Sequence, residues 1–78
     1  MKIVYIYDIF AKNKKEFNRI KRNFYYHLGK LPLKKENWKT KSTFAVELAS
    51  EKIYDEFFKN YKKNIKIYKI LATEIEEL

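Results

Sequence analysis

The hydrophobic residues of this chain follow two periods, one typical of strands and one typical of helices. Residues 2–8 read Lys-Ile-Val-Tyr-Ile-Tyr-Asp, with β-branched and aromatic side chains on both faces, which indicates a central strand. Over residues 13–30 apolar side chains recur every three or four positions, which predicts a helix with one apolar stripe. Asn13 is suited to cap its first turn, and Gly29 followed by Pro32 is suited to end it.

The second half of the chain repeats this alternation of extended and helical patterns. Residues 37–48 read as extended structure, either one bent strand or two short strands, because no Asn-Gly turn marks a hairpin. Ser50 is suited to cap a second helix over about 51–62, whose inner side is predicted to hold Ile53, Tyr54, Phe57, Phe58 and Tyr61. Residues 65–71 predict a last strand, which residues 72–78 either extend or follow with another.

The order of these elements predicts the fold class, which is α+β. Two amphipathic helices on one face of an antiparallel sheet form a ferredoxin-like βαββαβ two-layer sandwich, and the whole chain makes one such domain. One sheet face is then bare. We expect Val4 and Ile6 to face the helices. Ile3, Tyr5 and Tyr7 would lie on the bare face, as the interface of a homodimer or as a platform on which bases stack.

The size and composition of the chain indicate how it reaches stability. Its 78 residues include no cysteine and one histidine, so neither disulfides nor a structural zinc site support the small core. Association with a second copy is the remaining route. His27 is interpreted as a surface or packing residue rather than a general base. No signal-like segment or membrane-length apolar run is present, so we expect a cytoplasmic protein without a membrane partner.

The net charge of +8 is concentrated in one part of the chain. Residues 12–41 hold eleven Lys or Arg and two Glu, and such a surface favours nucleic acid over two alternatives, solubility alone and a membrane or other partner. The residues expected to bind nucleic acid are Lys12, Lys15, Arg19, Arg22, Lys39 and Lys41. The acidic end, Glu74–Glu77, is expected either to reach the basic helix of a second copy or to form a frayed tail.

Asp8 is the one candidate for metal chemistry. It ends the first strand, where its carboxylate can reach a metal ion, and two such carboxylates across a dimer axis would bind Mg²⁺ better than one. The alternative is that Asp8 caps a turn over residues 8–12. The sequence contains no nucleophile, base and acid set, no Gly-rich phosphate loop and no cluster with metal-ligand spacing.

Three short motifs carry a resemblance to a known family. They are Tyr7-Asp8-Ile9, Thr40-Lys41-Ser42-Thr43-Phe44 and Ile65-Lys66-Ile67-Tyr68. Together they resemble the second CRISPR-associated protein family, the small partner of the spacer integrase, and the order of elements matches over nearly the whole chain. Thr40 departs from the family pattern, which usually has Gln there. The virulence-associated D toxins are related and share the fold.

The resemblance implies a ferredoxin-like homodimer in antiviral defence, with the two Asp8 carboxylates near the dimer axis. Some members of the family cleave RNA or DNA with Mg²⁺ held there, and others form a structural bridge that holds DNA between integrase dimers. The implied function is therefore nucleic-acid binding, with Mg²⁺-dependent endonuclease activity open and with Asp8 as its catalytic and metal-binding residue.

Two alternatives belong to other functional classes. Val4-Tyr5-Ile6 resembles the shorter signature of the RNA-recognition motif, with Tyr5 as the stacking ring. Thr43 and Ala45, however, occupy the places in the longer signature where aromatic residues belong. The second alternative is a ligand-sensing regulatory domain of the same fold, which lacks Gly-rich loops for a small ligand.

Overall fold

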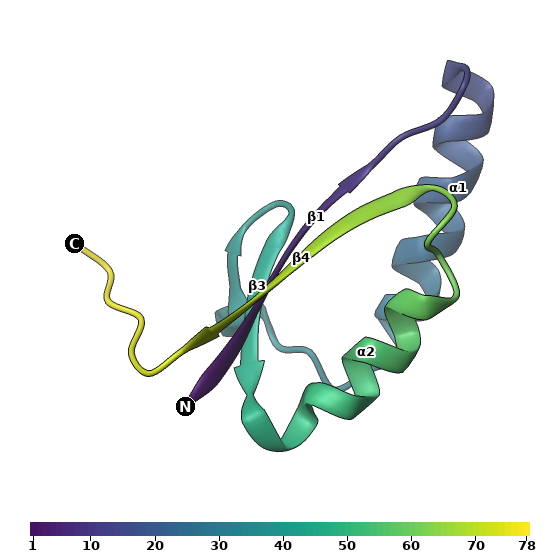
Figure 1. Cartoon of the computed structure of the whole chain (residues 1–78). Helices are drawn as coiled ribbons and strands as arrows, with labels where there is room; N and C mark the ends of the chain where they lie inside the picture. Colours follow the sequence, from purple (N-terminus) through teal and green to yellow (C-terminus); the bar gives the residue numbers. More distant parts are fainter.

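The computed structural model describes residues 1–78 and has two layers, with both helices on one face of a four-stranded sheet (Figure 1). The strand order is β2-β3-β1-β4 and every neighbouring pair is antiparallel, which confirms the ferredoxin-like sandwich. The elements are β1 (Lys2–Ile9), α1 (Lys14–Leu28), β2 (Trp38–Thr40), β3 (Thr43–Glu47), α2 (Glu51–Lys59) and β4 (Ile65–Ala72). Short 3₁₀ turns at Lys35–Asn37 and Leu48–Ser50 flank the β2–β3 hairpin.

The first helix follows its sequence signals closely. The Asn13 side-chain oxygen accepts a hydrogen bond from the Glu16 backbone N–H at 2.8 Å, which confirms the predicted cap. Ile20, Phe24 and Leu28 form the buried stripe that faces the sheet. The helix ends two residues before the predicted boundary.

The second helix is shorter than predicted and begins differently. It ends at Lys59, and the side chain of Ser50 makes no capping hydrogen bond. Tyr54, Phe57 and Phe58 are buried as predicted, but Ile53 is 46% exposed, so its predicted inward orientation is wrong. Ile53 lies on the flank of the buried stripe, because the helical period turns it away from the side that holds Tyr54, Phe57 and Phe58.

Residues 37–48 form two short strands and parts of the flanking turns, rather than one bent strand. The hairpin between β2 and β3 turns at Lys41 and Ser42 without any residue of positive φ. The hydroxyl oxygens of Tyr7 and Tyr25 lie 2.8 Å from each other and 3.3 Å from the Lys41 carbonyl oxygen. Tertiary hydrogen bonds therefore support a turn that has no strong turn residues of its own.

The inward face of β1 is the opposite of the one predicted. Ile3, Tyr5 and Tyr7 are 1%, 1% and 3% exposed and form part of the core beneath the helices, so their assignment to a dimer interface is wrong. The two tyrosine rings fill this space against Phe44 and Phe58, with ring centroids 5.3–6.3 Å apart. Small β-branched side chains at these positions would leave that volume unfilled.

The hydroxyl groups of Tyr5 and Tyr7 are paired at the margin of the core. The Tyr5 hydroxyl donates to Asp55 Oδ1 at 2.8 Å. Burial and this carboxylate raise the pKa of Tyr5, and burial with the Tyr25 hydroxyl raises the pKa of Tyr7. Because each ring is apolar and each hydroxyl finds a partner, tyrosine is well suited to this inner face.

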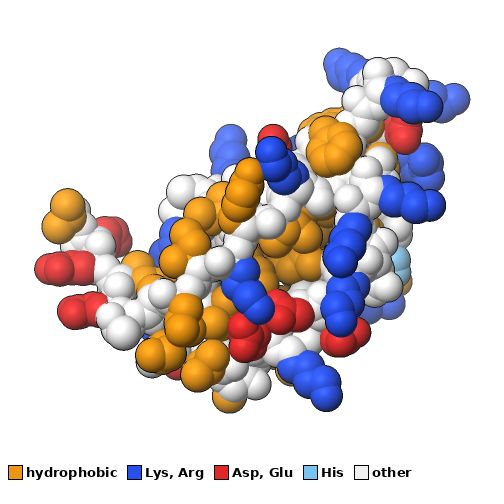
Figure 2. Space-filling view, viewed as in Figure 1, with side chains coloured by type: hydrophobic (Ala, Val, Ile, Leu, Met, Phe, Trp, Pro, Cys, Tyr) orange, Lys and Arg blue, Asp and Glu red, His pale blue; other side chains and the backbone are white.

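The bare sheet face carries an apolar strip, formed by Val4 and Ile6 of β1 and their cross-strand partners Ile70 and Tyr68 of β4. Ile70 and Tyr68 are 47% and 54% exposed, and hydrophobic side chains gather along this part of the molecule in Figure 2. The strand ends at Ala72, and the following residues extend away from the sheet without forming another strand (Figure 1).

A cluster of charges ties β4 to α2. Lys69 Nζ lies 2.7 Å from Glu51 Oε2 and 2.9 Å from Asp55 Oδ2. These hydrogen bonds raise the pKa of Lys69. This contact fixes the edge strand β4 against α2. Neither helix has the length and apolar character that crossing a bilayer requires.

Candidate nucleic-acid interface

The outward face of α1 presents a row of cations, here called the basic ridge and defined as Lys15, Arg19 and Arg22. All three are exposed, and their spacing of four and three residues places them along one face of the helix. Tyr26 continues the row and is 63% exposed. The ammonium of Lys30 lies 4.5 Å from the centroid of the Tyr26 ring.

Almost none of the basic charge is neutralised within the chain. Of eighteen Lys and Arg, three form ion pairs, namely Lys2, Lys59 and Lys69. No cation of the basic ridge is among them. Lys and Arg side chains cover much of the helix layer in Figure 2, whereas acidic side chains gather beside α2 and at the C-terminal tail. The ridge is therefore available to an external anion.

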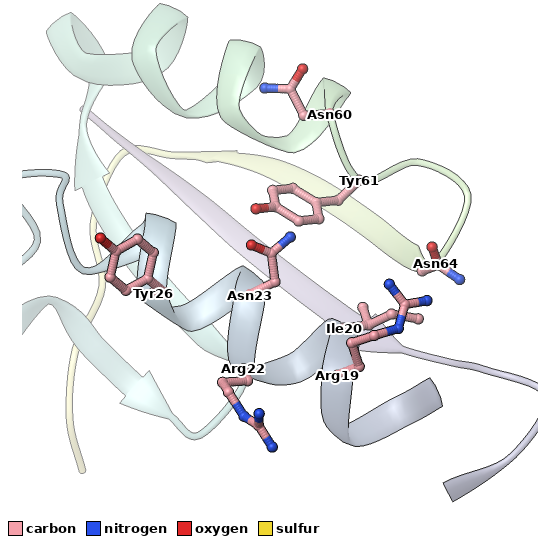
Figure 3. A pocket seen from close by; sticks show the side chains of 8 residues that line it. All are labelled: Arg19, Ile20, Arg22, Asn23, Tyr26, Asn60, Tyr61 and Asn64. Carbon is pink, nitrogen blue, oxygen red and sulfur yellow. The ribbon is translucent and has the colours of Figure 1, made fainter. Parts of the chain in front are cut away.

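Beside the ridge lies a hollow of about 580 Å³, here called the helix groove, between α1 and the segment that follows α2 (Figure 3). Its lining residues from α1 are Arg19, Ile20, Arg22, Asn23 and Tyr26. Those from the other wall are Asn60, Tyr61 and Asn64. No acidic residue lines it. In Figure 3 the Arg19 side chain reaches toward Asn64, and Arg22 extends away from the other lining residues.

Tyr61 is a fixed wall of this groove. Its ring packs against Phe24 and Phe57, with centroid distances of 5.3 and 5.2 Å. Its hydroxyl oxygen lies 3.0 Å from His27 Nδ1, and that nitrogen lies 2.9 Å from the Asn23 carbonyl oxygen. Burial raises the pKa of Tyr61. A single Nδ1–H can be shared by these two oxygens, and the contact with Tyr61 joins α1 to the segment that follows α2.

The asparagines of the chain differ in what they do for the fold. Asn13 caps α1, and Asn37 binds the Lys34 N–H and the Ala45 carbonyl at 2.8 and 2.9 Å. The side-chain amides of Asn23 and Asn64 form no hydrogen bond within the chain, and Asn60 donates only a long one of 3.5 Å to the Glu56 carbonyl. The amides that line the groove are therefore largely free to bind a ligand.

The structure separates the remaining residues predicted to bind nucleic acid. Lys12 is exposed in the loop before α1, and Lys41 is exposed at the β2–β3 turn. Lys39 lines a different cavity, of about 320 Å³, near the outer strand β2. That cavity also contains Lys2, Lys34, Glu36 and Glu47. Its mixed charges favour an anion less than the helix groove does.

Asp8 is exposed on the bare sheet face, within β1 and opposite Lys66 of β4. Its side chain makes no hydrogen bond, so the alternative that it caps a turn over residues 8–12 is wrong. No group of three His, Cys, Asp or Glu in the chain could hold a metal ion. One copy thus offers Mg²⁺ a single carboxylate, a donor set that does not fit the ion without a second copy.

The geometry also bears on the resemblance to the RNA-recognition motif. That interpretation needs Tyr5 on the bare face, but the Tyr5 ring is buried beneath the helices. The exposed ring on the bare face is Tyr68 instead. A stacking platform built on Tyr5 is therefore wrong for this chain.

Sequence reasoning missed Asn23, Asn60 and Asn64 as residues of a site. A signal was present, because asparagine is a poor helix former and Asn23 stands in the middle of a helix without a capping role. What the sequence lacks is the contact between α1 and the end of α2, which brings these amides to one groove. Comparison of the chain with protein-family models, with curated proteins and with solved structures finds no match.

Proposed function

We propose that this protein binds nucleic acid through the basic ridge and the helix groove, and that it works in the cytoplasm. The observation that carries the proposal is the lining of the groove, which contains Arg19 and Arg22 and no acidic residue. Neither arginine forms an ion pair within the chain. Guanidinium groups bind phosphate oxygens through two parallel N–H donors, which suits a phosphodiester backbone.

A surface that served solubility alone would not need this arrangement. Lysines scattered among acids, as in the cavity near β2, are sufficient for a solvated surface. The groove instead combines two arginines with free amides and an exposed aromatic ring. Those are the side chains that bind phosphate, base edges and base faces.

We further propose that the protein acts as a homodimer through the apolar strip of Val4, Ile6, Tyr68 and Ile70. Each copy carries an acid and a base, Asp8 and Lys66, at one end of this strip. Two copies related by a two-fold axis near that end bring their Asp8 carboxylates close together, where the two carboxylates repel each other unless a cation lies between them. Burial of the strip would remove exposed apolar surface that a small domain otherwise presents to water.

The resemblance to the second CRISPR-associated family supports a role in spacer acquisition within this proposal. The two forms of that role are a structural DNA bridge beside an integrase and a Mg²⁺-dependent nuclease acting on RNA or DNA. The single carboxylate of Asp8 in each copy favours the bridge, because nuclease chemistry would depend on the dimer to complete a metal site.

Duplex DNA binding at several salt concentrations tests the proposal. The double variant Arg19→Gln/Arg22→Gln removes two phosphate contacts, so the slope of log affinity against log salt should fall by about 1.8. At about 0.1 M salt the same relation predicts an affinity loss of about 60-fold. Fluorescence anisotropy with a labelled duplex measures both quantities.

The matched control is Lys35→Gln/Lys52→Gln, which removes the same charge from two exposed lysines that line neither cavity described above. Its slope and affinity should change much less. Equal effects of the two double variants would show that net charge, and not the ridge and groove, determines binding. A wild-type protein that binds no nucleic acid would end the proposal.

A further inference from the structure

We infer that the helix groove receives an unpaired, single-stranded segment of nucleic acid, with one base stacked on Tyr26. This inference rests on the proposed function and specifies its substrate class at the same site. A duplex keeps its base faces stacked inside the helix, so its backbone can lie along the basic ridge but its bases cannot enter a groove. An unpaired base can enter and can present both its face and its edge.

The aromatic ring available to such a base is Tyr26. It is 63% exposed, whereas Tyr61 is packed against Phe24 and Phe57 and holds His27 through its hydroxyl. The Lys30 ammonium lies over the Tyr26 ring at 4.5 Å. A base that stacks there would take the place of this ammonium, which would then be free to bind the phosphate that flanks the base.

The side-chain amides of the groove supply contacts to the edge of the base. Each carries a donor and an acceptor, which is what the edges of unpaired bases require. Asn23 and Asn64 leave both groups unused within the chain, and Figure 3 shows Asn23 directed toward Tyr61 across the groove. Arg19 belongs to the ridge and also lines the groove with these amides, so a backbone phosphate bound to Arg19 keeps the attached base within reach of the amides.

A second hollow beside the groove favours a strand over a free nucleotide. This cavity, of about 400 Å³, shares Asn60 and Tyr61 with the groove and is lined also by His27 and Phe57. The groove alone is within the size range of sites for single small ligands. A strand of several nucleotides contacts both hollows, whereas a single nucleotide fills only one.

Anisotropy titrations with short single-stranded DNA, single-stranded RNA of the same sequence and the corresponding duplex test the inference. Tyr26→Leu should weaken single-strand binding at least about fivefold, the lower end of what one stacked base contributes. Its duplex affinity should stay within about twofold of wild type, because the cations of the ridge remain. Tyr26→Phe keeps the ring and should bind single strands as the wild type does.

Phe10→Leu is the matched control, since Phe10 is a comparably exposed aromatic residue, 51% exposed, that lines neither the groove nor the apolar strip. Its single-strand affinity should be unchanged. If Phe10→Leu loses binding and Tyr26→Leu does not, bases stack away from Tyr26 and the inference is overturned. If neither variant weakens single-strand binding while duplex binding persists, the groove takes no base, although the proposed function stands. If a free nucleoside monophosphate displaces the strand from Tyr26 with equal affinity, the site is one for nucleotides and the inference also fails.

Discussion

Replacing Tyr54 by Phe removes one oxygen atom from the core and is expected to raise the free energy of unfolding. Tyr54 is 1% exposed, and its hydroxyl is buried without a hydrogen-bond partner. Its ring packs against Phe44 and Tyr5 at centroid distances of 5.4 and 5.9 Å, and phenylalanine keeps these contacts. Burial also raises the pKa of Tyr54. The substitution therefore changes the polar group alone.

The magnitude follows from the cost of leaving a polar group unpaired. A buried hydroxyl without a partner costs about 1–3 kcal/mol, so its removal should stabilise the protein by about 1 kcal/mol. For a domain of this size that raises the Tm by about 4–8 °C. Tyr5→Phe is the matched comparison, because the Tyr5 hydroxyl does have partners, Asp55 Oδ1 at 2.8 Å and the Glu51 carbonyl oxygen at 3.1 Å.

Tyr5→Phe should have the opposite sign. A hydrogen bond to a charged group contributes about 1.5–3 kcal/mol, but the Asp55 side chain is 35% exposed and water replaces part of the lost contact. We therefore expect a loss of about 1 kcal/mol. Urea unfolding followed by circular dichroism measures both free energies with one protocol. A stability loss in Tyr54→Phe would refute the reasoning, since it would show that the hydroxyl has a partner, such as a water in the cavity lined by Lys2 and Lys34.

Three further predictions concern the bare sheet face and the charge cluster. Asp8→Asn should raise the Tm of the metal-free protein, because two carboxylates brought together by dimerisation repel each other. The same variant should leave duplex affinity unchanged and should abolish any Mg²⁺-dependent cleavage. Cleavage that persists would place the catalytic carboxylate elsewhere. Light scattering of the wild type should report about twice the chain mass. The variant Ile70→Lys should be monomeric in the same measurement, because an unpaired ammonium cannot be buried in the apolar strip. A monomeric wild type would contradict sheet-to-sheet packing. Burial opposes ionisation of the Asp55 carboxyl, but hydrogen bonds from Lys69 and Tyr5 hold its pKa below the ordinary value. The ionised Asp55 carboxylate then stabilises the fold fully above about pH 4, and this contribution is lost as the pH falls through the lower pKa of the folded state. Between about pH 6 and pH 3 the urea midpoint of wild type should therefore decrease more than that of Asp55→Asn. Equal decreases would show that other carboxylates cause the acid sensitivity.

Local patterns were sufficient to predict the elements and their order. The strand near the N-terminus, the helix capped by Asn13 and the buried stripe of Ile20, Phe24 and Leu28 were all predicted and are all present. These features depend on interactions between residues a few positions apart, such as the Asn13 to Glu16 hydrogen bond and the helical period. The order of elements then limited the fold to a two-layer sandwich.

The inward face of β1 could not be determined from the same patterns. Both faces of this strand are apolar, and a period of two does not distinguish them. Packing volume decided the matter, because the rings of Tyr5 and Tyr7 fill the space between sheet and helices. Their hydroxyls find Asp55 and Tyr25, partners 50 and 18 residues away, and no local pattern shows such contacts.

The helix groove was likewise determined by tertiary structure. The sequence marked Arg19 and Arg22 as outward cations on a helix, and the structure leaves both exposed. Their neighbours Asn60 and Asn64 come from a segment about forty residues further along the chain, which reaches α1 only because both helices pack on the same face of the sheet. Charge and periodicity are properties of short segments and are visible in the sequence, whereas a groove between two segments exists only after their apolar faces have been buried together.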